Sequence, residues 1–237
     1  MERKEKLAAC FQKYEKMIDD KKLEQFLNYY DLLIEWNSFM NLTTITDFGE
    51  VLEKHFLDSI KMIDYFDISK ADKILDLGTG AGFPGIPLKI LYPKLNFVLM
   101  DSLNKRIKFL NEVILQLGLS NITAIHGRAE EAAKNEKYRE QFDFVVSRAV
   151  ANLSTLSEYC LPFVKVNGMF LSYKSGKIEE ELENGKKAIQ ILGGKCEEIV
   201  HFKLNHEIER TFIPVKKVKP TPKKYPRAGG KPSKEPL

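Results

Sequence analysis

A glycine-rich stretch near the middle of the chain has the residue types of a loop that binds a ligand through its backbone. It runs from Asp76 to Gly85 as DLGTGAGFPG, directly after a short apolar run. A strand that leads through such a turn into a helix lets a ligand approach the main chain closely. Phe83 stands where the dinucleotide-binding fingerprint has its third glycine, and the Gly-Lys-Ser/Thr of a triphosphate-binding loop is missing. What remains is an acidic residue followed by Gly78, Gly80 and Gly82 at alternate positions.

Two further elements suit a ligand that contains adenosine. Asp101 ends the next apolar run, 19 residues after Gly82, where a carboxylate can accept both ribose hydroxyls, although it could also only cap the following helix. Ala129 and Glu130 follow the third run, although Glu130 alone is also typical of a helix first turn. Together these elements resemble class I S-adenosyl-L-methionine-dependent methyltransferases, whose cofactor has no phosphate in its adenosine half. The resemblance implies that Ala129 and Glu130 flank the adenine ring and that Phe83 also contacts the cofactor.

The residues after the fourth apolar run argue against two kinds of methyl acceptor. The sequence there is Ser147-Arg148-Ala149, without the acid-or-Asn-Pro-Pro-aromatic motif of enzymes that methylate exocyclic amines. No cysteine stands at the ends of the fourth or fifth run, which argues against C5 methylation of pyrimidines through a covalent adduct.

Six motifs in order carry a more specific resemblance, which covers nearly the whole chain. They are Asn41-Leu42-Thr43, the HFLDS of residues 55–59, the DLGTGAGFPGIP of residues 76–87, the DSLNKR of residues 101–106, Ser147-Arg148-Ala149 and Tyr225-Pro226-Arg227. The chain resembles the ribosomal small-subunit methyltransferase G family, first called glucose-inhibited division protein B. The resemblance implies methyl transfer from S-adenosyl-L-methionine to N7 of one guanine in the decoding region of 16S rRNA, in the small ribosomal subunit or its precursor.

Guanine N7 is an in-plane lone pair without a proton, so its methylation needs no obligatory general base. Catalysis then depends on holding N7, the methyl carbon and sulfur in line. We expect Arg148 to orient the base or a phosphate, and the family resemblance also associates it with the cofactor site. Asp58 is a candidate acceptor from the guanine Watson–Crick edge and His55 a candidate RNA contact. An equally simple interpretation makes His55 a hydrogen-bonded core residue and Asn41 a turn or cap residue.

The apolar patterning predicts an α/β fold that positions these residues. Residues 1–65 predict an N-terminal helical layer, with helices over 2–18 and 21–38 and a third after Asp47. Residues 66–215 predict a class I methyltransferase domain, Rossmann-like, with a seven-stranded sheet in which one strand is antiparallel. The strands are expected near 73–77, 96–100, 122–125, 142–146, 169–173, 196–202 and 210–215, the last two forming a hairpin around Asn205-His206. Helices are expected from Pro84, over 105–117, from about 152 and over 178–192.

The positive charge is concentrated in the last 22 residues, 216–237. They hold eight basic side chains and one acidic side chain, so the segment carries +7 although the chain as a whole carries only +4. Its prolines and glycines disfavour a helix and predict a basic extended arm that contacts phosphates. The ring of Tyr225 is a candidate surface on which an RNA base could stack. The alternative interpretation is a solvated tail.

The remaining features suggest a cytoplasmic protein. The chain begins with charged residues that lead into no long apolar stretch, and no run approaches the length of a membrane span. Its three cysteines form no CxxC pair, so we expect packed thiols and no metal site. We expect a monomer without membrane association. Two rival functions stay open: methylation of a small molecule, and RNA binding without catalysis.

Overall fold

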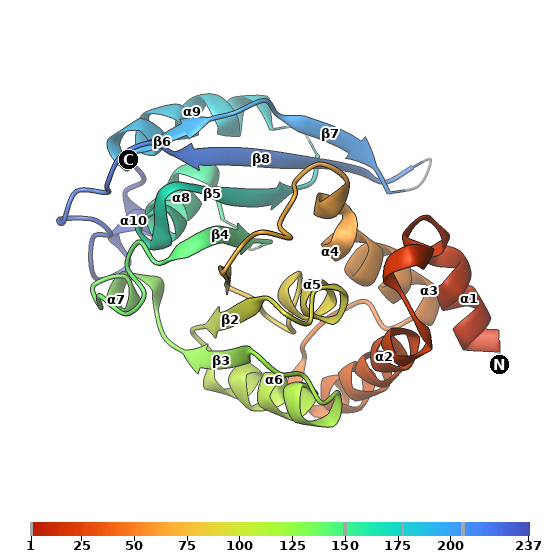
Figure 1. The fold of residues 1–237 in the computed structure, drawn as a ribbon. Helices are drawn as coiled ribbons and strands as arrows, with labels where there is room; N and C mark the ends of the chain where they lie inside the picture. Colours follow the sequence, from red (N-terminus) through yellow and green to blue (C-terminus); the bar gives the residue numbers. More distant parts are fainter. Residues whose placement is uncertain (1, 149–150, 177, 205–206) are drawn as a thin grey trace.

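The computed structural model describes residues 2–148, 151–176, 178–204 and 207–237. An eight-stranded sheet runs through the centre of the protein (Figure 1). Five parallel strands and one antiparallel strand form most of it, and two short strands complete the edge. The spatial order is β3-β2-β1-β4-β5-β8-β6, and β7 also pairs with β8. The strands are β1 (Lys73–Leu77), β2 (Asn96–Asp101), β3 (Ile122–His126), β4 (Phe142–Ser147), β5 (Val164–Lys174), β6 (Gly194–Cys196), β7 (Val200–Lys203) and β8 (Glu209–Lys217).

The predicted α/β fold is confirmed, and within the described residues β8 alone runs antiparallel to the other strands. The sheet differs from the prediction at its edge, where the expected strand over 196–202 is divided into β6 and β7. Pro214 of β8 faces this division, since its carbonyl accepts from the Glu197 N–H at 2.9 Å. Proline has no N–H to donate to a ladder, so the edge strand cannot pair continuously across it. The predicted connection at Asn205-His206 lies outside the described residues, but β7 and β8 are antiparallel neighbours.

Side chains of the central strands alternate between two apolar cores, as period-two strands require. In β1, Ile74 belongs to one core and Leu75 to the other. Figure 1 shows helices on both faces. The first face carries the N-terminal helices, α5 (Gly85–Leu91) and α6 (Asn104–Gln116). The second carries α7 (Ala129–Ala132), α8 (Leu153–Cys160), the 3-10 turn Leu161–Phe163 and α9 (Glu179–Ile191).

The N-terminal layer is helical as predicted, but its first and third helices are interrupted. The layer consists of α1 (Glu2–Cys10), a 3-10 turn (Gln12–Met17), α2 (Asp20–Met40), α3 (Phe48–Val51), a π-helical turn (Leu52–Leu57), α4 (Asp58–Ile60) and a 3-10 turn (Lys61–Asp64). Asp47 caps α3, because its carboxylate accepts from the Glu50 N–H at 3.0 Å. Asn41 ends α2 in the left-handed conformation, with φ of 52°. The π-helical turn contains His55, and such turns are frequent at functional sites.

The C-terminal segment packs on the body instead of projecting from it. Arg227 donates to both oxygens of Glu158, a carboxylate on α8 that is fully buried. Thr221 donates its N–H to Glu140 at 2.7 Å, and the segment ends with the short α10 (Lys231–Lys234). Tyr225 is only 7% exposed, so the expectation that its ring offers a stacking surface is wrong for this conformation. In the part of the chain that the structure describes, no helix has both the length and the apolar character needed to span a membrane.

Candidate functional site

The candidate site lies where the chain order of the sheet reverses, beyond the carboxyl ends of β1 and β4. Open α/β sheets bind their ligands at this position. The glycine loop follows β1, and Arg148 follows β4. Two cavities meet here, and His55 and Arg148 line both of them. The first cavity has a volume of about 660 Å³ and the second about 1090 Å³.

The glycine loop forms one wall of the first cavity. Gly78, Gly80 and Gly82 all have positive φ, at 71°, 63° and 101°, which side chains other than glycine rarely adopt. A Cβ on Gly80 would meet nothing within 4 Å, so this glycine leaves its face of the loop open. A Cβ on Gly82 would instead lie 2.7 Å from Ile86 and from the Tyr29 hydroxyl. The alternate glycines therefore serve different needs: a close approach of ligand to backbone and a close approach of helix to loop.

Asp76 supports the loop from below. Its Oδ2 accepts from the Thr79 hydroxyl at 2.7 Å and from the Gly85 N–H at 2.8 Å. Its Oδ1 is buried and has no hydrogen-bond partner among the described residues. Burial raises the pKa of the Asp76 carboxyl to about 7. The acidic residue of the motif thus fixes the turn through these two hydrogen bonds. Its carboxyl group has a pKa close to neutral pH.

Asp101 reaches the first cavity from the end of β2. It accepts from the Gly80 N–H at 2.9 Å and from the Leu103 N–H at 2.9 Å, just before α6 begins. Arg106 also donates to it, at 3.1 Å. Its bond to the Leu103 N–H agrees with the expected role as a cap of the following helix. The same carboxylate also lines the cavity beside the glycine loop. A ribose that used both oxygens would have to compete with Arg106.

The opposite wall comes from the end of β3 and from α8. Ala129 and Glu130 line the first cavity as the sequence predicts. Leu156 and Tyr159 of α8 join them, and sequence reasoning missed both. Their spacing of three residues on a helix was visible, but only the packing of α8 against α7 brings that face to the cavity.

Arg148 connects the sheet to the N-terminal layer. Its guanidinium donates to Asp58 Oδ2 at 3.0 Å, to the Lys54 carbonyl at 3.1 Å and to His55 Nδ1 at 3.1 Å. Its Cζ also lies 5.0 Å from the centre of the Phe83 ring, in reach of a cation–π contact. The structure therefore brings together four of the predicted residues, Arg148, Asp58, His55 and Phe83.

The bonding of His55 identifies its protonation state. A guanidinium can only donate, so Nδ1 of His55 accepts, and Nε2 carries the proton that it donates to the Thr43 hydroxyl at 2.9 Å. The ring stacks on Phe83 with 4.5 Å between centroids. Burial and the nearby Arg148 charge lower the pKa of His55 to about 3. His55 is thus a neutral imidazole with both nitrogens in use.

Asp58 lies between two arginines. Its second oxygen accepts from Arg210 Nε of β8 at 3.2 Å, and the residue is only 3% exposed. Burial raises the pKa of the Asp58 carboxyl, and the two guanidiniums oppose this shift. Both carboxylate oxygens are engaged by protein, which suits a group that holds Arg148 better than one that binds a base directly.

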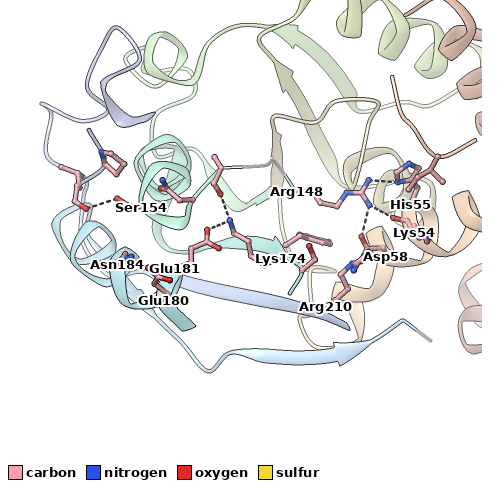
Figure 2. A pocket seen from close by; sticks show the side chains of 17 residues that line it. Lys54, His55, Asp58, Arg148, Ser154, Lys174, Glu180, Glu181, Asn184 and Arg210 are labelled. Carbon is pink, nitrogen blue, oxygen red and sulfur yellow. Dashed lines mark hydrogen bonds and ion pairs between the residues drawn. The ribbon is translucent and has the colours of Figure 1, made fainter. Parts of the chain in front are cut away.

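Figure 2 shows the second cavity, which extends from the Arg148 cluster to α9. Lys174, at the end of β5, donates to the Ala151 carbonyl at 2.6 Å and to Glu181 of α9 at 2.5 Å. Sequence reasoning missed Lys174, Glu181 and Arg210. Lys174 had a signal, because it is the last residue of β5, at the same edge of the sheet where Arg148 follows β4. Among the described residues, no cluster of three or more His, Cys, Asp or Glu is arranged to hold a metal ion.

Solved structures with the same fold include a protein with bound AdoMet and an S-adenosylmethionine-dependent methyltransferase. The structure of M. jannaschii TYW2 in complex with AdoMet matches with a TM-score of 0.54 and 16% identity over 69% of this chain and 76% of that one. A SAM-dependent methyltransferase from Aquifex aeolicus matches with a TM-score of 0.53 and 19% identity over 70% and 92%. At these identities the likeness shows the fold alone.

Sequence relatives are far more similar. Proteins named ribosomal RNA small subunit methyltransferase G match at 64% identity in Lachnoclostridium phytofermentans, over 91% of this chain and 89% of the relative, and at 52% in Clostridium novyi, over 92% and 90%. The family model described as rRNA small subunit methyltransferase G matches residues 22–212, which include the glycine loop, Arg148 and its partners. The chain belongs to the rRNA small subunit methyltransferase G family.

Proposed function

We propose that this methyltransferase transfers the methyl group of S-adenosyl-L-methionine to N7 of one guanine in 16S rRNA. The observation that carries the proposal is the junction of two cavities at His55 and Arg148. The first cavity has the loop and carboxylate that suit the cofactor, and the second has room for a nucleotide. A methyl group at the junction would be accessible from both cavities.

The first cavity fits the cofactor through groups already present. Gly80 leaves its face of the loop open, Asp101 offers a carboxylate for the ribose, and Ala129 and Glu130 supply a small surface and a polar edge for adenine. Phe83 and Arg148 border the end nearest the second cavity. When bound, the cofactor supplies a methyl group on a positively charged sulfur. The chain's own part is to align that group and keep the acceptor in place.

The chemistry of the junction supports an acceptor without a proton to remove. His55 is neutral but uses both ring nitrogens, for Arg148 and Thr43. Asp58 is held by two arginines. Neither group is available as a general base, whereas guanine N7 needs none. Arg148 can then orient the base, and Asp58 and His55 act by holding Arg148 in position.

Exposed lysines of the C-terminal segment support an RNA substrate. Lys219, Lys223, Lys224, Lys231 and Lys234 are exposed, whereas Lys217 is buried and donates to Thr221 at 2.8 Å. Gly230 lines the first cavity and Leu237 the second, so the segment reaches the site. Its exposed cations can attract phosphates and release their counterions. We therefore assign residues 216–237 to phosphate contact as a docked segment, residues 66–215 to the methyltransferase domain and residues 1–65 to the helical layer. We also propose that the protein acts as a cytoplasmic monomer on the small subunit or its precursor.

Methylation of small-subunit RNA by the purified protein tests this function. The assay supplies tritiated methyl donor and 16S rRNA or 30S particles from cells that lack the gene, and maps the product by cleavage specific for 7-methylguanosine. Label at a single guanine is expected. Cofactor binding without label on any RNA would refute the proposal and favour a small-molecule substrate or a binding protein.

A further inference from the structure

We propose that Glu181 and Lys174 read the Watson–Crick edge of the target guanine and so select guanine over other bases. The proposal rests on the proposed function and assigns the recognition step within it. These residues line the second cavity together with His55 and Arg148, and in the described part of the chain no hydrogen bond or ion pair joins the two pairs. The second cavity therefore has two polar groups: the Arg148 cluster, which also borders the first cavity, and the Lys174–Glu181 pair, which does not. Figure 2 shows the two groups as separate.

The Lys174–Glu181 pair presents a donor and an acceptor next to each other. Lys174 Nζ donates to Glu181 Oε1 at 2.5 Å and to the Ala151 carbonyl at 2.6 Å. An ammonium has three N–H groups, so a further donor remains beyond these two bonds. The side chain of Lys174 is 10% exposed and that of Glu181 is 26% exposed, so both are partly shielded but reachable from the cavity. Desolvation of this kind strengthens a hydrogen bond to a charged group.

The order of donor and acceptor matches guanine. Starting from the side of N7, the edge of guanine presents the O6 acceptor, then the N1–H donor and the N2 amino donor. Figure 2 shows Lys174 Nζ between Arg148 and Glu181 in this view. A guanine with N7 toward Arg148 would meet the ammonium with O6 and the carboxylate with N1–H and N2–H. Adenine in the same pose would place its N6 amino donor against the ammonium, which is unfavourable.

Other polar residues of the second cavity are less suited to this task. Arg210 is committed to Asp58. Lys54 forms an ion pair with Glu50. Glu180 and Asn184 lie on the exposed surface of α9, where water competes for their hydrogen bonds. The shielded pair of Lys174 and Glu181 is therefore better suited to recognise a base than these four residues.

The test compares two RNA substrates that differ only at the target position, guanine or inosine. Inosine keeps O6, N1–H and N7 but lacks the N2 amino group. The wild-type protein is expected to methylate the guanine substrate with a kcat/KM about 10-fold higher or more, as for one hydrogen bond to a charged acceptor. Glu181→Gln keeps the shape and an acceptor for Lys174, but presents an amide donor to the base. It is expected to lower kcat/KM for guanine by about 10- to 100-fold and to reduce the preference over inosine to within about 2-fold.

Glu183→Gln is the matched control. Glu183 is on the same helix, pairs with Lys186 at 2.5 Å and does not line the second cavity, so its variant should keep both activity and base preference. Cofactor affinity of Glu181→Gln should stay close to that of the wild type, since Glu181 does not line the first cavity. Its melting temperature should fall only slightly, because Gln keeps an acceptor for Lys174 and Glu181 is partly exposed.

Two results would overturn the assignment while leaving the proposed function intact. One is a wild-type protein that methylates inosine and guanine equally well. The other is a Glu181→Gln variant that loses the same factor on both substrates, as expected if the ion pair only holds α9 to β5. Failure of the wild type to form 7-methylguanine in any RNA would instead refute the proposed function and this inference with it.

Discussion

Replacement of Asp58 by Asn tests whether this carboxylate acts through Arg148. Asp58 accepts from Arg148 at 3.0 Å and from Arg210 at 3.2 Å, and is 3% exposed. Removal of one partner from a buried ion pair costs about 3–5 kcal/mol, because the remaining charge is uncompensated. Asn keeps one acceptor oxygen, so we expect the free energy of unfolding to fall by about 3 kcal/mol. Arg148 would lose its fixed position, and misplacement of an orienting group by about 1 Å can lower the rate about 100-fold.

A double-mutant cycle separates this role from direct contact with the base. If Asp58 acts only by positioning Arg148, the variant with both Asp58→Asn and Arg148→Ala should be no slower than Arg148→Ala alone. The coupling would then equal the whole effect of Asp58→Asn, about 2.7 kcal/mol for a 100-fold loss. The measurements are single-turnover methylation at saturating cofactor and denaturant unfolding of each variant. Multiplied losses in the double variant would refute the positioning argument.

Asp64 provides the control for a general effect of lost ion pairs. It lies in the same helical stretch as Asp58 and is also held by two cations, Lys13 at 2.6 Å and Lys61 at 2.8 Å. It lines neither of the two cavities. Asp64→Asn should therefore cost some stability but leave methyl transfer within about 2-fold of the wild type.

Three further predictions follow from the packing. Gly82→Ala should destabilise the fold by at least about 2 kcal/mol in thermal unfolding, because its Cβ would lie 2.7 Å from Ile86 at a φ of 101°; an unchanged melting temperature would contradict the described turn. His55, with a folded pKa near 3, should stay neutral by ¹⁵N NMR down to about pH 4. Since the unfolded chain binds this proton near pH 6.5, stability should fall by up to about 1.4 kcal/mol per unit as the pH drops from 6.5 towards 3, and His55→Gln should flatten that slope. Glu158→Gln should weaken the ion pair with Arg227, which is 2.7 Å long, and so release the C-terminal segment and speed its cleavage by trypsin. A variant as resistant to trypsin as the wild type would show that other contacts are enough to hold the segment.

The sequence predicts the first cavity better than the second for a physical reason. The glycine loop and Asp101 each belong to a short stretch of sequence with a characteristic spacing. Neighbouring residues along the chain therefore determine their geometry. Leu156 and Tyr159 belong to α8, and the spacing of residues along this helix does not show which part of the protein it packs against. Their place in the cavity depends on how α8 packs against α7, which no local pattern fixes.

The Arg148 cluster illustrates the same limit. His55 and Asp58 were both predicted as candidate site residues, and the structure brings both to Arg148. Their bonding could not be read from spacing, because Arg210 comes from β8, 152 residues from Asp58 along the chain. The C-terminal segment was predicted from its composition to be extended, but Arg227 and Glu158 fix it to α8 through a contact between distant parts of the chain.

The division of the outer strand at Pro214 protects the sheet from joining another sheet. A long regular edge offers unpaired N–H and C=O groups to any other strand, which promotes aggregation. Here β6 and β7 are only three and four residues long, and the gap between them exposes Glu197 and Glu198. A neighbouring chain would find no continuous ladder to extend and would meet two carboxylates at the break. This edge can therefore stay open to water even at the high protein concentrations of a cell.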